Sequence, residues 1–412
     1  MHAFGLRTWI LLLPAALLWA CACPPPPAAE PASHLHDVTS EGWQPADLAQ
    51  AMALLDRRDE HAWEDHGRAL RVPRHPAEKY LDGWLIVLDP GHGGKADVAG
   101  YKRGPTGVRE AEMNLRVARL LRRLLQDAGA DVLLTREGET SEAADDRLKD
   151  THERRARIAN RATRADGGVG ADLFVSLHHN ASSKPTANYP SIWFHGEADW
   201  SEVALDAALA VGHRLGAELR NAGTGITSVL MSDRQMYANG FAVLRHARVP
   251  AFLIESSFFS HPQEEQRLRD ALYNLREAYA IYLGLVEYAY GGRPTQSTPT
   301  VRVHGGRIRV ETVLVDGLPG WWGSDRQRTL SSTMTVTCDG ERLRVSYDPA
   351  SRTLTAEGDG LAEGAGEHVL GVHHANLYKH HNWPQRYRVK VRADGGVDVQ
   401  ALHAPFAGER SR

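Results

Sequence analysis

The sequence predicts an α/β domain with an open, mostly parallel, twisted sheet flanked by helices, followed by a small all-β domain. Between residues 84 and 290, short apolar runs alternate with amphipathic segments of helical spacing, which is typical of a layered α/β domain. Between residues 301 and 403, runs of alternating polarity are separated by turns such as Asp339-Gly340, which favour β-hairpins. A linker rich in Gly, Ser, Thr and Pro at 291–299 separates the two patterns.

The composition bounds the classes of protein that this chain can belong to. It has 412 residues, of which 42% are hydrophobic and 24% charged, so it can bury a core and is not a coiled coil or a disordered chain. The net charge of −3 encodes no general attraction to nucleic acid, and we expect no such partner. Three cysteines do not make a disulfide scaffold.

The N-terminus has the pattern of an export signal. A positively charged start at 1–7 precedes an apolar run at 8–20, which is too short to span a bilayer comfortably. The sequence Leu18-Trp19-Ala20-Cys21 resembles the lipobox of bacterial lipoproteins, with Trp19 as an unusual residue. It predicts lipid attachment at Cys21 and a lipid-anchored protein of the periplasm or cell envelope. Attachment at Cys23, or a plain secretory signal, stays open.

We expect four segments along the chain. A signal peptide with lipobox at 1–23 precedes a Pro-rich tether and helical lead-in at 24–80, with a helix at 45–57. The α/β domain occupies 81–292 and the accessory β domain 300–405. Predicted strands of the α/β domain lie at 85–88, 132–135, 172–177, 192–194, 243–244 and 251–254, and predicted helices at 110–128, 151–163, 201–222 and 262–288. Predicted strands of the β domain lie at 307–315, 333–337, 342–347, 353–356, 386–391 and 397–402.

Four acid or histidine residues fall where predicted strands end or a helix begins. His92 follows the first strand, Glu110 opens the long helix, His178 caps the strand at 172–177, and Glu255 ends the strand at 251–254. Sites in open α/β sheets gather outside the carboxyl ends of the strands. Two imidazoles and one carboxylate make a catalytic zinc set, and a further carboxylate can serve as general base. Taken singly, each residue also fits a packed histidine or a surface carboxylate at a helix start.

Several ordered motifs are similar to those of zinc-dependent N-acetylmuramoyl-L-alanine amidases, a family of bacterial cell-wall hydrolases. The resemblance covers about residues 84–290. It rests on LIVLDPGHGG (85–94), GVREAEMNL (107–115), LLTR (133–136), Arg155 with Ala159-Asn160, ADLFVSLH (171–178) with Asn180-Ala181, and VPAFLIESSFFS (249–260). Their order and separations agree with the family pattern.

The resemblance implies that one Zn²⁺ is held by His92, Glu110 and His178, with Glu255 as the general base. The implied reaction releases the L-alanine of the peptidoglycan stem peptide from the lactyl group of N-acetylmuramic acid. His179 stands where the family usually has a small residue, so two histidines compete for one ligand role, and the alignment favours His178.

Other departures from the family pattern bear on substrate fit. The chain has an insertion at 167–170, and Ser256-Ser257 and His261 replace more usual residues. Candidate residues that contact substrate or orient the ligands are Asn180, His179 and Arg155, with Asp89 as a further orienting candidate. The sequence does not identify a protein activator.

Two other functions remain open on the sequence. One is a catalytically silent peptidoglycan-binding or regulatory lipoprotein on the same fold, and the other is a zinc hydrolase of a different amide. In the β domain, His374-Ala375-Asn376, followed by His380-His381, mimics the third ligand segment. We favour a polar loop flanked by Tyr378 and Trp383 over a second metal site there. Trp321-Trp322 is a candidate sugar-stacking pair or a buried pair, and Cys338 is predicted to be a small buried hydrophobe.

Overall fold

The computed structural model describes residues 74–93, 102–138, 151–184, 186–196, 201–219, 229–319, 328–359 and 366–402. The predicted signal peptide with Cys21 and Cys23, the helix expected at 45–57 and the pair Trp321-Trp322 lie outside the described residues. Within the described ranges, none of the helices combines the length and the apolar character that crossing a membrane requires.

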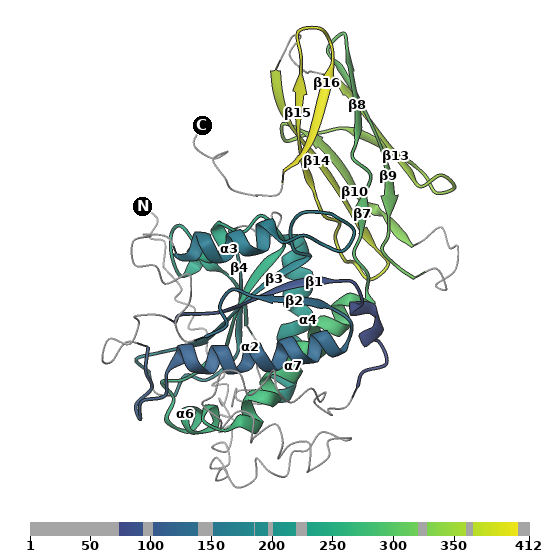
Figure 1. Ribbon diagram of the computed structural model, residues 1–412. Helices are drawn as coiled ribbons and strands as arrows, with labels where there is room; N and C mark the ends of the chain where they lie inside the picture. Colours follow the sequence, from purple (N-terminus) through teal and green to yellow (C-terminus); the bar gives the residue numbers. More distant parts are fainter. Residues whose placement is uncertain are drawn as a thin grey trace, which may run out of the picture. The chain divides into compact units, whose positions relative to one another are not determined.

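A mixed, mostly parallel sheet forms the centre of the α/β domain (Figure 1). Its strands are β1 (Leu85–Pro90), β2 (Asp131–Leu134), β3 (Leu173–Asn180), β4 (Ser191–Phe194), β5 (Val229–Ser232) and β6 (Ala251–Phe258). They lie in the order β2-β1-β3-β6-β4-β5. In this order, β2, β1, β3 and β6 are parallel to one another, β4 is antiparallel to β6, and β5 is parallel to β4. The carboxyl ends of β1, β3 and β6 therefore meet at one edge, as predicted.

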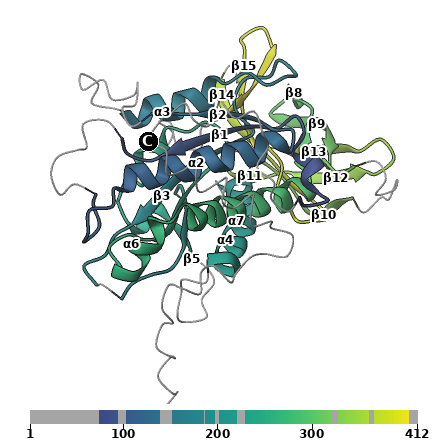
Figure 2. The same ribbon diagram turned by 60° about the horizontal axis from the view of Figure 1, so that its bottom comes forward.

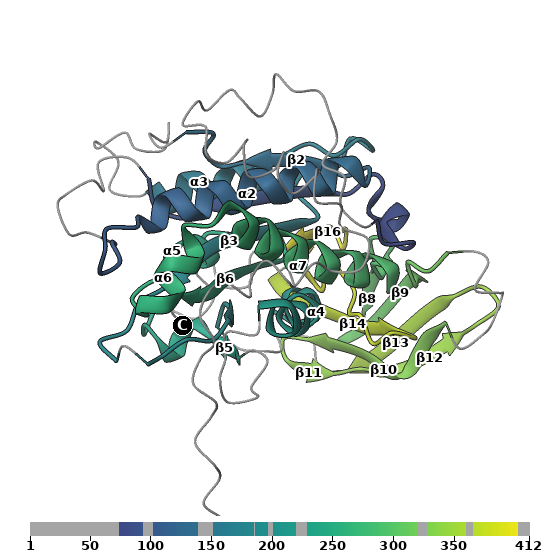
Figure 3. The same ribbon diagram turned by 90° about the horizontal axis from the view of Figure 1, so that it is seen from below.

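Helices cover both faces of this sheet, which confirms the predicted fold class. They are α2 (Glu110–Asp127), α3 (Thr151–Arg161), α4 (Glu202–Leu219), α5 (Ala242–Arg245), α6 (Pro262–Leu268) and α7 (Ala271–Tyr290), with short 3₁₀ turns at Glu78–Leu81 and Asp233–Gln235. Helices α2, α4 and α7 pack on one face and α3 and α5 on the other (Figures 1 and 3). Helix α2 buries Met113, Val117, Leu121 and Leu124 at helical spacing. Gly129 follows the helix with φ 95°, the left-handed conformation in which many helices end.

Four predicted elements of the α/β domain differ from the structure. Strands β3 and β6 continue past their predicted ends, so His178 and Glu255 lie within strands. The strand predicted at 243–244 is wrong, because Val243 and Leu244 belong to helix α5 and pack into the core with Phe174. A two-residue apolar run does not distinguish a strand from a buried helical turn. The helix predicted at 262–288 is two helices, α6 and α7, and β5 was not predicted.

The C-terminal domain consists of two mainly antiparallel sheets. One has the order β11 (Glu341–Arg342), β10 (Thr329–Cys338), β14 (Gly366–Asn376), β15 (Arg386–Val391) and β16 (Val397–Leu402). The other has the order β12 (Arg344–Asp348), β13 (Thr353–Asp359), β9 (Arg307–Val315) and β7 (Thr295–Gln296), and β8 (Thr300–His304) also pairs with β9. Apolar side chains of both sheets form one core, which includes Cys338 as predicted.

The polar loop predicted from residue 373 onward is wrong for residues 373–376, because these residues belong to strand β14. Residues 377–380, which follow, lie outside any strand. His374 and Asn376 are fully buried. Asn376 Nδ2 donates to the carbonyl oxygens of Gly291 (2.7 Å) and Asp316 (3.0 Å). Hydrogen bonds of this kind let polar residues occupy an interior strand position.

Polar side chains join the β domain to helix α4. His373 Nδ1 lies 3.2 Å from Glu202 Oε2, and Gln385 Nε2 donates to the same oxygen at 2.5 Å. The backbone N–H of His381 donates to Asp206 Oδ2 at 2.7 Å. Glu202 and Asp206 are one helical turn apart, so a single face of α4 makes these contacts.

Candidate metal centre and active site

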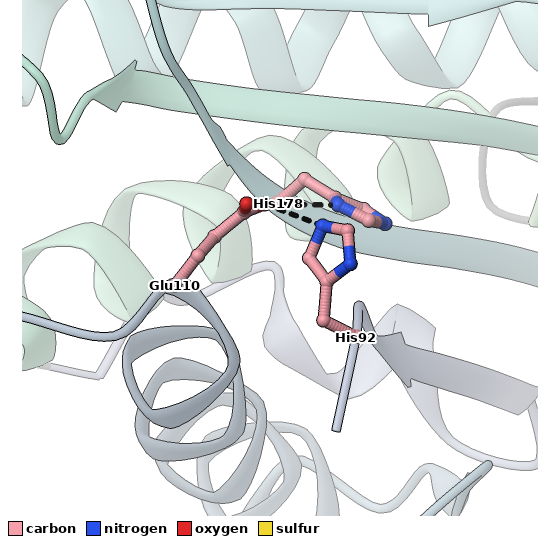
Figure 4. Close-up of side chains that lie close together, drawn as sticks. All are labelled: His92, Glu110 and His178. Carbon is pink, nitrogen blue, oxygen red and sulfur yellow. Dashed lines mark hydrogen bonds and ion pairs between the residues drawn. The ribbon is translucent and has the colours of Figure 1, made fainter. Parts of the chain in front are cut away.

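Three segments that are distant in sequence place His92, Glu110 and His178 together (Figure 4). His92 follows β1, Glu110 is the first residue of α2, and His178 lies in β3. Oε1 of Glu110 lies 3.1 Å from His92 Nε2 and 3.1 Å from His178 Nδ1. One ligand atom from each residue lies within 4.8 Å of the other two. This arrangement matches the two-imidazole, one-carboxylate donor set that the sequence predicts.

Backbone geometry at Gly91 and His92 makes room for the cluster. His92 has φ 60°, in the left-handed region that few non-glycine residues adopt. A Cβ atom on Gly91 would lie 2.2 Å from Cε1 and Nε2 of His178. The N–H of Gly91 donates to the carbonyl of Leu177 at 2.9 Å, which ties the loop to β3. Only glycine therefore lets the two histidine rings approach.

A buried ion pair fixes the backbone on either side of this loop. Arg155 Nη1 donates to Asp89 Oδ1 at 2.6 Å and to the carbonyl of Pro90 at 2.8 Å, and Nη2 donates to the carbonyl of His92 at 2.5 Å. Burial alone would raise the pKa of Asp89, but Arg155 and the hydroxyls of Thr135 and Ser176 outweigh it and lower the pKa to about 2. Arg155 and Asp89 thus hold the His92 loop from inside the protein.

The protonation states of the cluster suit a metal ion. Burial would raise the pKa of Glu110, but hydrogen bonds to His178 and His92 lower it, so the carboxylate is ionised. Burial lowers the pKa of His178 to about 4, so its imidazole is neutral at pH 7, as metal binding requires. Oε2 of Glu110 is buried without a hydrogen-bond partner among the described residues, with Lys102 Nζ 3.9 Å away. This donor set and orphaned oxygen fit a zinc ion.

Glu255 lies next to the cluster on the neighbouring strand. It is the register partner of His178 in the parallel pair β3–β6, so the two side chains share a face of the sheet. Oε2 of Glu255 is buried and has no hydrogen-bond partner among the described residues. Burial, and then the charge of Glu110, raises the pKa of Glu255 well above its usual value. Glu255 is therefore separate from the three clustered donors and is set up to hold a proton.

The other predicted site residues lie in different surroundings. His179 points away from His178 into the core, where Nδ1 lies 2.8 Å from Asn114 Oδ1 and Nε2 lies 3.1 Å from Glu277 Oε2. Burial would lower the pKa of His179, but the Glu277 carboxylate outweighs this effect and raises it. Asn180 Oδ1 accepts from the N–H of the next residue at 2.8 Å, and the Asn180 carbonyl accepts from Phe259 at 2.9 Å.

Sequence reasoning missed residues that support the ligand loops. Asn114 Nδ2 donates to the Gly91 carbonyl at 3.2 Å, and its position one helical turn after Glu110 was a usable signal. The fully buried Glu265 accepts from the backbone N–H groups of Thr106 (2.8 and 2.9 Å) and Val108 (3.2 Å), in the segment before Glu110. No local pattern connects Glu265 with a loop that lies about 160 residues earlier.

Residues 86–287 match the protein family described as N-acetylmuramoyl-L-alanine amidase. This segment of the chain belongs to that family. His92, Glu110, His178 and Glu255 all lie within the matched amidase segment.

Individual relatives carry related names. The probable cell wall amidase LytH of Staphylococcus epidermidis is 27% identical over 209 residues, which are 50% of this chain and 59% of the relative. LytH of Staphylococcus aureus is 28% identical with the same coverage. The chain thus spans about three-fifths of the length of these curated relatives. The CwlD amidase from Clostridioides difficile, solved in complex with the GerS lipoprotein, aligns with 50% of this chain and 98% of its own, at 23% identity and a TM-score of 0.41.

Proposed function

We propose that this chain is a zinc-dependent N-acetylmuramoyl-L-alanine amidase. Its reaction would hydrolyse the amide between the lactyl group of N-acetylmuramic acid and the L-alanine of the peptidoglycan stem peptide. The observation that supports it best is the convergence of His92, Glu110 and His178, with ligand atoms within 4.8 Å, beside Glu255 and inside an amidase-family segment.

The ligands and the base have distinct roles in this proposal. One zinc ion held by His92, Glu110 and His178 would polarise the scissile carbonyl and acidify water. Glu255 takes the proton of the attacking water and passes it to the nitrogen of the departing L-alanine. Its raised pKa makes Glu255 a stronger proton acceptor than an ordinary carboxylate.

The remaining residues orient rather than react. Arg155 holds the His92 carbonyl, and the backbone N–H of His179 donates to Glu110 Oε1 at 3.2 Å. These contacts keep the ligand side chains aimed at a common point. Asn180 lies in the same β3 segment as His178 and stays a candidate contact for substrate.

The segments outside the amidase domain complete the proposal. A signal at 1–23 would export the chain to the periplasm or cell envelope, and a lipid on Cys21 would anchor it near the peptidoglycan. The tether at 24–80 would give the amidase domain at 81–292 reach toward the wall, and the β domain at 300–405 would be an accessory module.

Digestion of purified peptidoglycan, followed by mass analysis of the products, tests the reaction. The proposal expects release of intact stem peptides from glycan, loss of this activity on chelation, and its return on adding Zn²⁺. Zinc binding without cleavage would instead identify a silent wall-binding protein. Cleavage of an unrelated amide alone would identify a hydrolase of different specificity.

A further inference from the structure

A line of buried polar side chains connects helix α7 with the loop that carries His92. Glu277 Oε2 lies 3.1 Å from His179 Nε2, and His179 Nδ1 lies 2.8 Å from Asn114 Oδ1. Asn114 Nδ2 then donates to the carbonyl of Gly91 at 3.2 Å. Glu277, His179 and Asn114 are each at most 2% exposed to solvent. Helices α2 and α7, which contribute Asn114 and Glu277, lie side by side (Figure 2).

The chemistry of the groups sets the direction of each hydrogen bond. A carbonyl oxygen only accepts, so Asn114 must present its amide nitrogen to Gly91 and its amide oxygen to His179. His179 Nδ1 must therefore carry the hydrogen that Asn114 Oδ1 accepts. His179 Nε2 faces the Glu277 carboxyl, and one proton joins that pair. Glu277 thereby fixes the ring orientation of His179, and His179 fixes the amide of Asn114.

This line of buried side chains ends at the Gly91 carbonyl, directly before His92. The Gly91 carbonyl also accepts from Arg136 Nη2 at 3.0 Å, and the next residue, His92, has φ 60°. Non-glycine residues hold that conformation only when their surroundings enforce it. The same His179 donates its backbone N–H to Glu110 Oε1. His179 therefore acts on two of the three donors, through Gly91 on His92 and directly on Glu110.

We infer that Glu277 is a positioning residue of the metal centre, acting through His179 and Asn114 on the loop that carries His92. This inference rests on the proposed function, because it assumes that His92, Glu110 and His178 hold an ion. Glu277 lies 22 residues beyond Glu255, on a helix that contributes neither a ligand nor the base.

Metal affinity, measured without substrate, tests the inference. Zn²⁺ affinity would be measured by competition with a chromogenic chelator on the full chain, and Co²⁺-substituted protein would give an absorption spectrum that reports ligand geometry. We expect Glu277→Ala to weaken Zn²⁺ binding by about 10-fold or more, change the Co²⁺ spectrum and lower kcat on a soluble peptidoglycan fragment, with KM within about 2-fold. Glu277→Gln should remain within about 3-fold of the native protein, because its amide N–H can donate to His179 Nε2.

Matched variants separate positioning from general damage. Glu287→Ala removes another carboxylate of α7, one that pairs with Arg214, and should leave Zn²⁺ affinity unchanged. If Glu277→Ala does not fold, Glu277→Asp, which keeps the charge but withdraws it by about 1.5 Å, should show the same loss of affinity. Native affinity and spectrum in the alanine or aspartate variant, or a glutamine variant as impaired as alanine, would overturn the inference. A native chain that binds no Zn²⁺ would instead overturn the proposed function.

Discussion

His178 and Glu255 are register partners on the adjacent parallel strands β3 and β6. Neighbouring strands lie about 4.8 Å apart, and paired residues project from the same face. The proposed base therefore lies beside a proposed ligand although 77 residues separate them in sequence (255 − 178). The pairing of these two strands sets the position of the proposed base relative to His178.

The first prediction concerns Glu255. Glu255→Gln removes the proton acceptor but keeps the size of the side chain, so we expect hydrolysis of peptidoglycan to fall by about 10³-fold. Zinc content, measured by mass spectrometry of the metal, should stay at the native level because Glu255 is outside the donor cluster. Glu112→Gln, on the exposed side of α2, is the control and should keep native activity. Near-native turnover of Glu255→Gln would rule out its role as base.

The second prediction concerns Gly91. In Gly91→Ala the new Cβ would collide with the ring of His178, 2.2 Å away, so the ring must move. We expect Zn²⁺ affinity to fall by about 10-fold or more, measured by competition with a chelator. Gly366→Ala is the matched control, since the nearest atom to its Cβ, His368 Nε2, lies at an ordinary 3.4 Å. Equal affinities of the two variants would contradict the required approach of Gly91 and His178.

The third prediction links Asp89 to acid stability. Its pKa is about 2 in the folded protein against 3.8 for an unperturbed carboxyl, so folding favours the ionised form. The contribution, about 2 kcal/mol, is complete above about pH 4 and is lost as the pH falls from about 4 to about 2. Asp89→Asn should therefore lower the free energy of unfolding at pH 7, as measured with denaturant, by at least that amount. The difference in the free energy of unfolding between the native protein and the variant should become smaller in acid. A difference that does not depend on pH would contradict this account.

The fourth prediction concerns Glu265, which anchors the segment before Glu110. Glu265→Ala removes the acceptor of three backbone hydrogen bonds from Thr106 and Val108. We expect a loss of about 2 kcal/mol in the free energy of unfolding and weaker Zn²⁺ binding, because Glu110 loses its fixed approach. Glu112→Ala, which removes only a partly exposed pair with Arg116, should change stability by less than about 0.5 kcal/mol. Similar stability of the two variants would show that Glu265 does not anchor the loop.

The sequence predicted that strands β3 and β6 exist, but it did not predict correctly where they end. The apolar runs before His178 and Glu255 identified β3 and β6, but both strands continue through these polar residues. A polar residue at a sheet edge breaks the apolar pattern without breaking the backbone pairing, so the predicted ends came too early. The family motifs, not spacing alone, distinguished His178 from His179, and the opposite faces of the two side chains now give the physical reason.

The buried polar contacts were beyond sequence reasoning. Glu277 and His179 are 98 residues apart, and nothing local marks either as a partner of the other. Asparagine is more common in loops than in strands, yet Asn376 lies in a buried strand. It can do so because its amide nitrogen donates hydrogen bonds to two carbonyl oxygens that are distant in sequence. Such residues are defined by tertiary contacts, which a single sequence does not display.

The contacts between α4 and the β domain lie away from the candidate active site. Glu202 and Asp206 follow β4, which runs opposite to β3 and β6, so they lie toward the amino-terminal edge of the parallel strands. The eight residues of β3 span roughly 25 Å, and His178 lies near the far end. The side chains of the β domain that contact α4 are therefore too far from His178 to touch a substrate bond at the candidate active site. Exchanging this module for another should therefore leave the proposed bond chemistry unchanged.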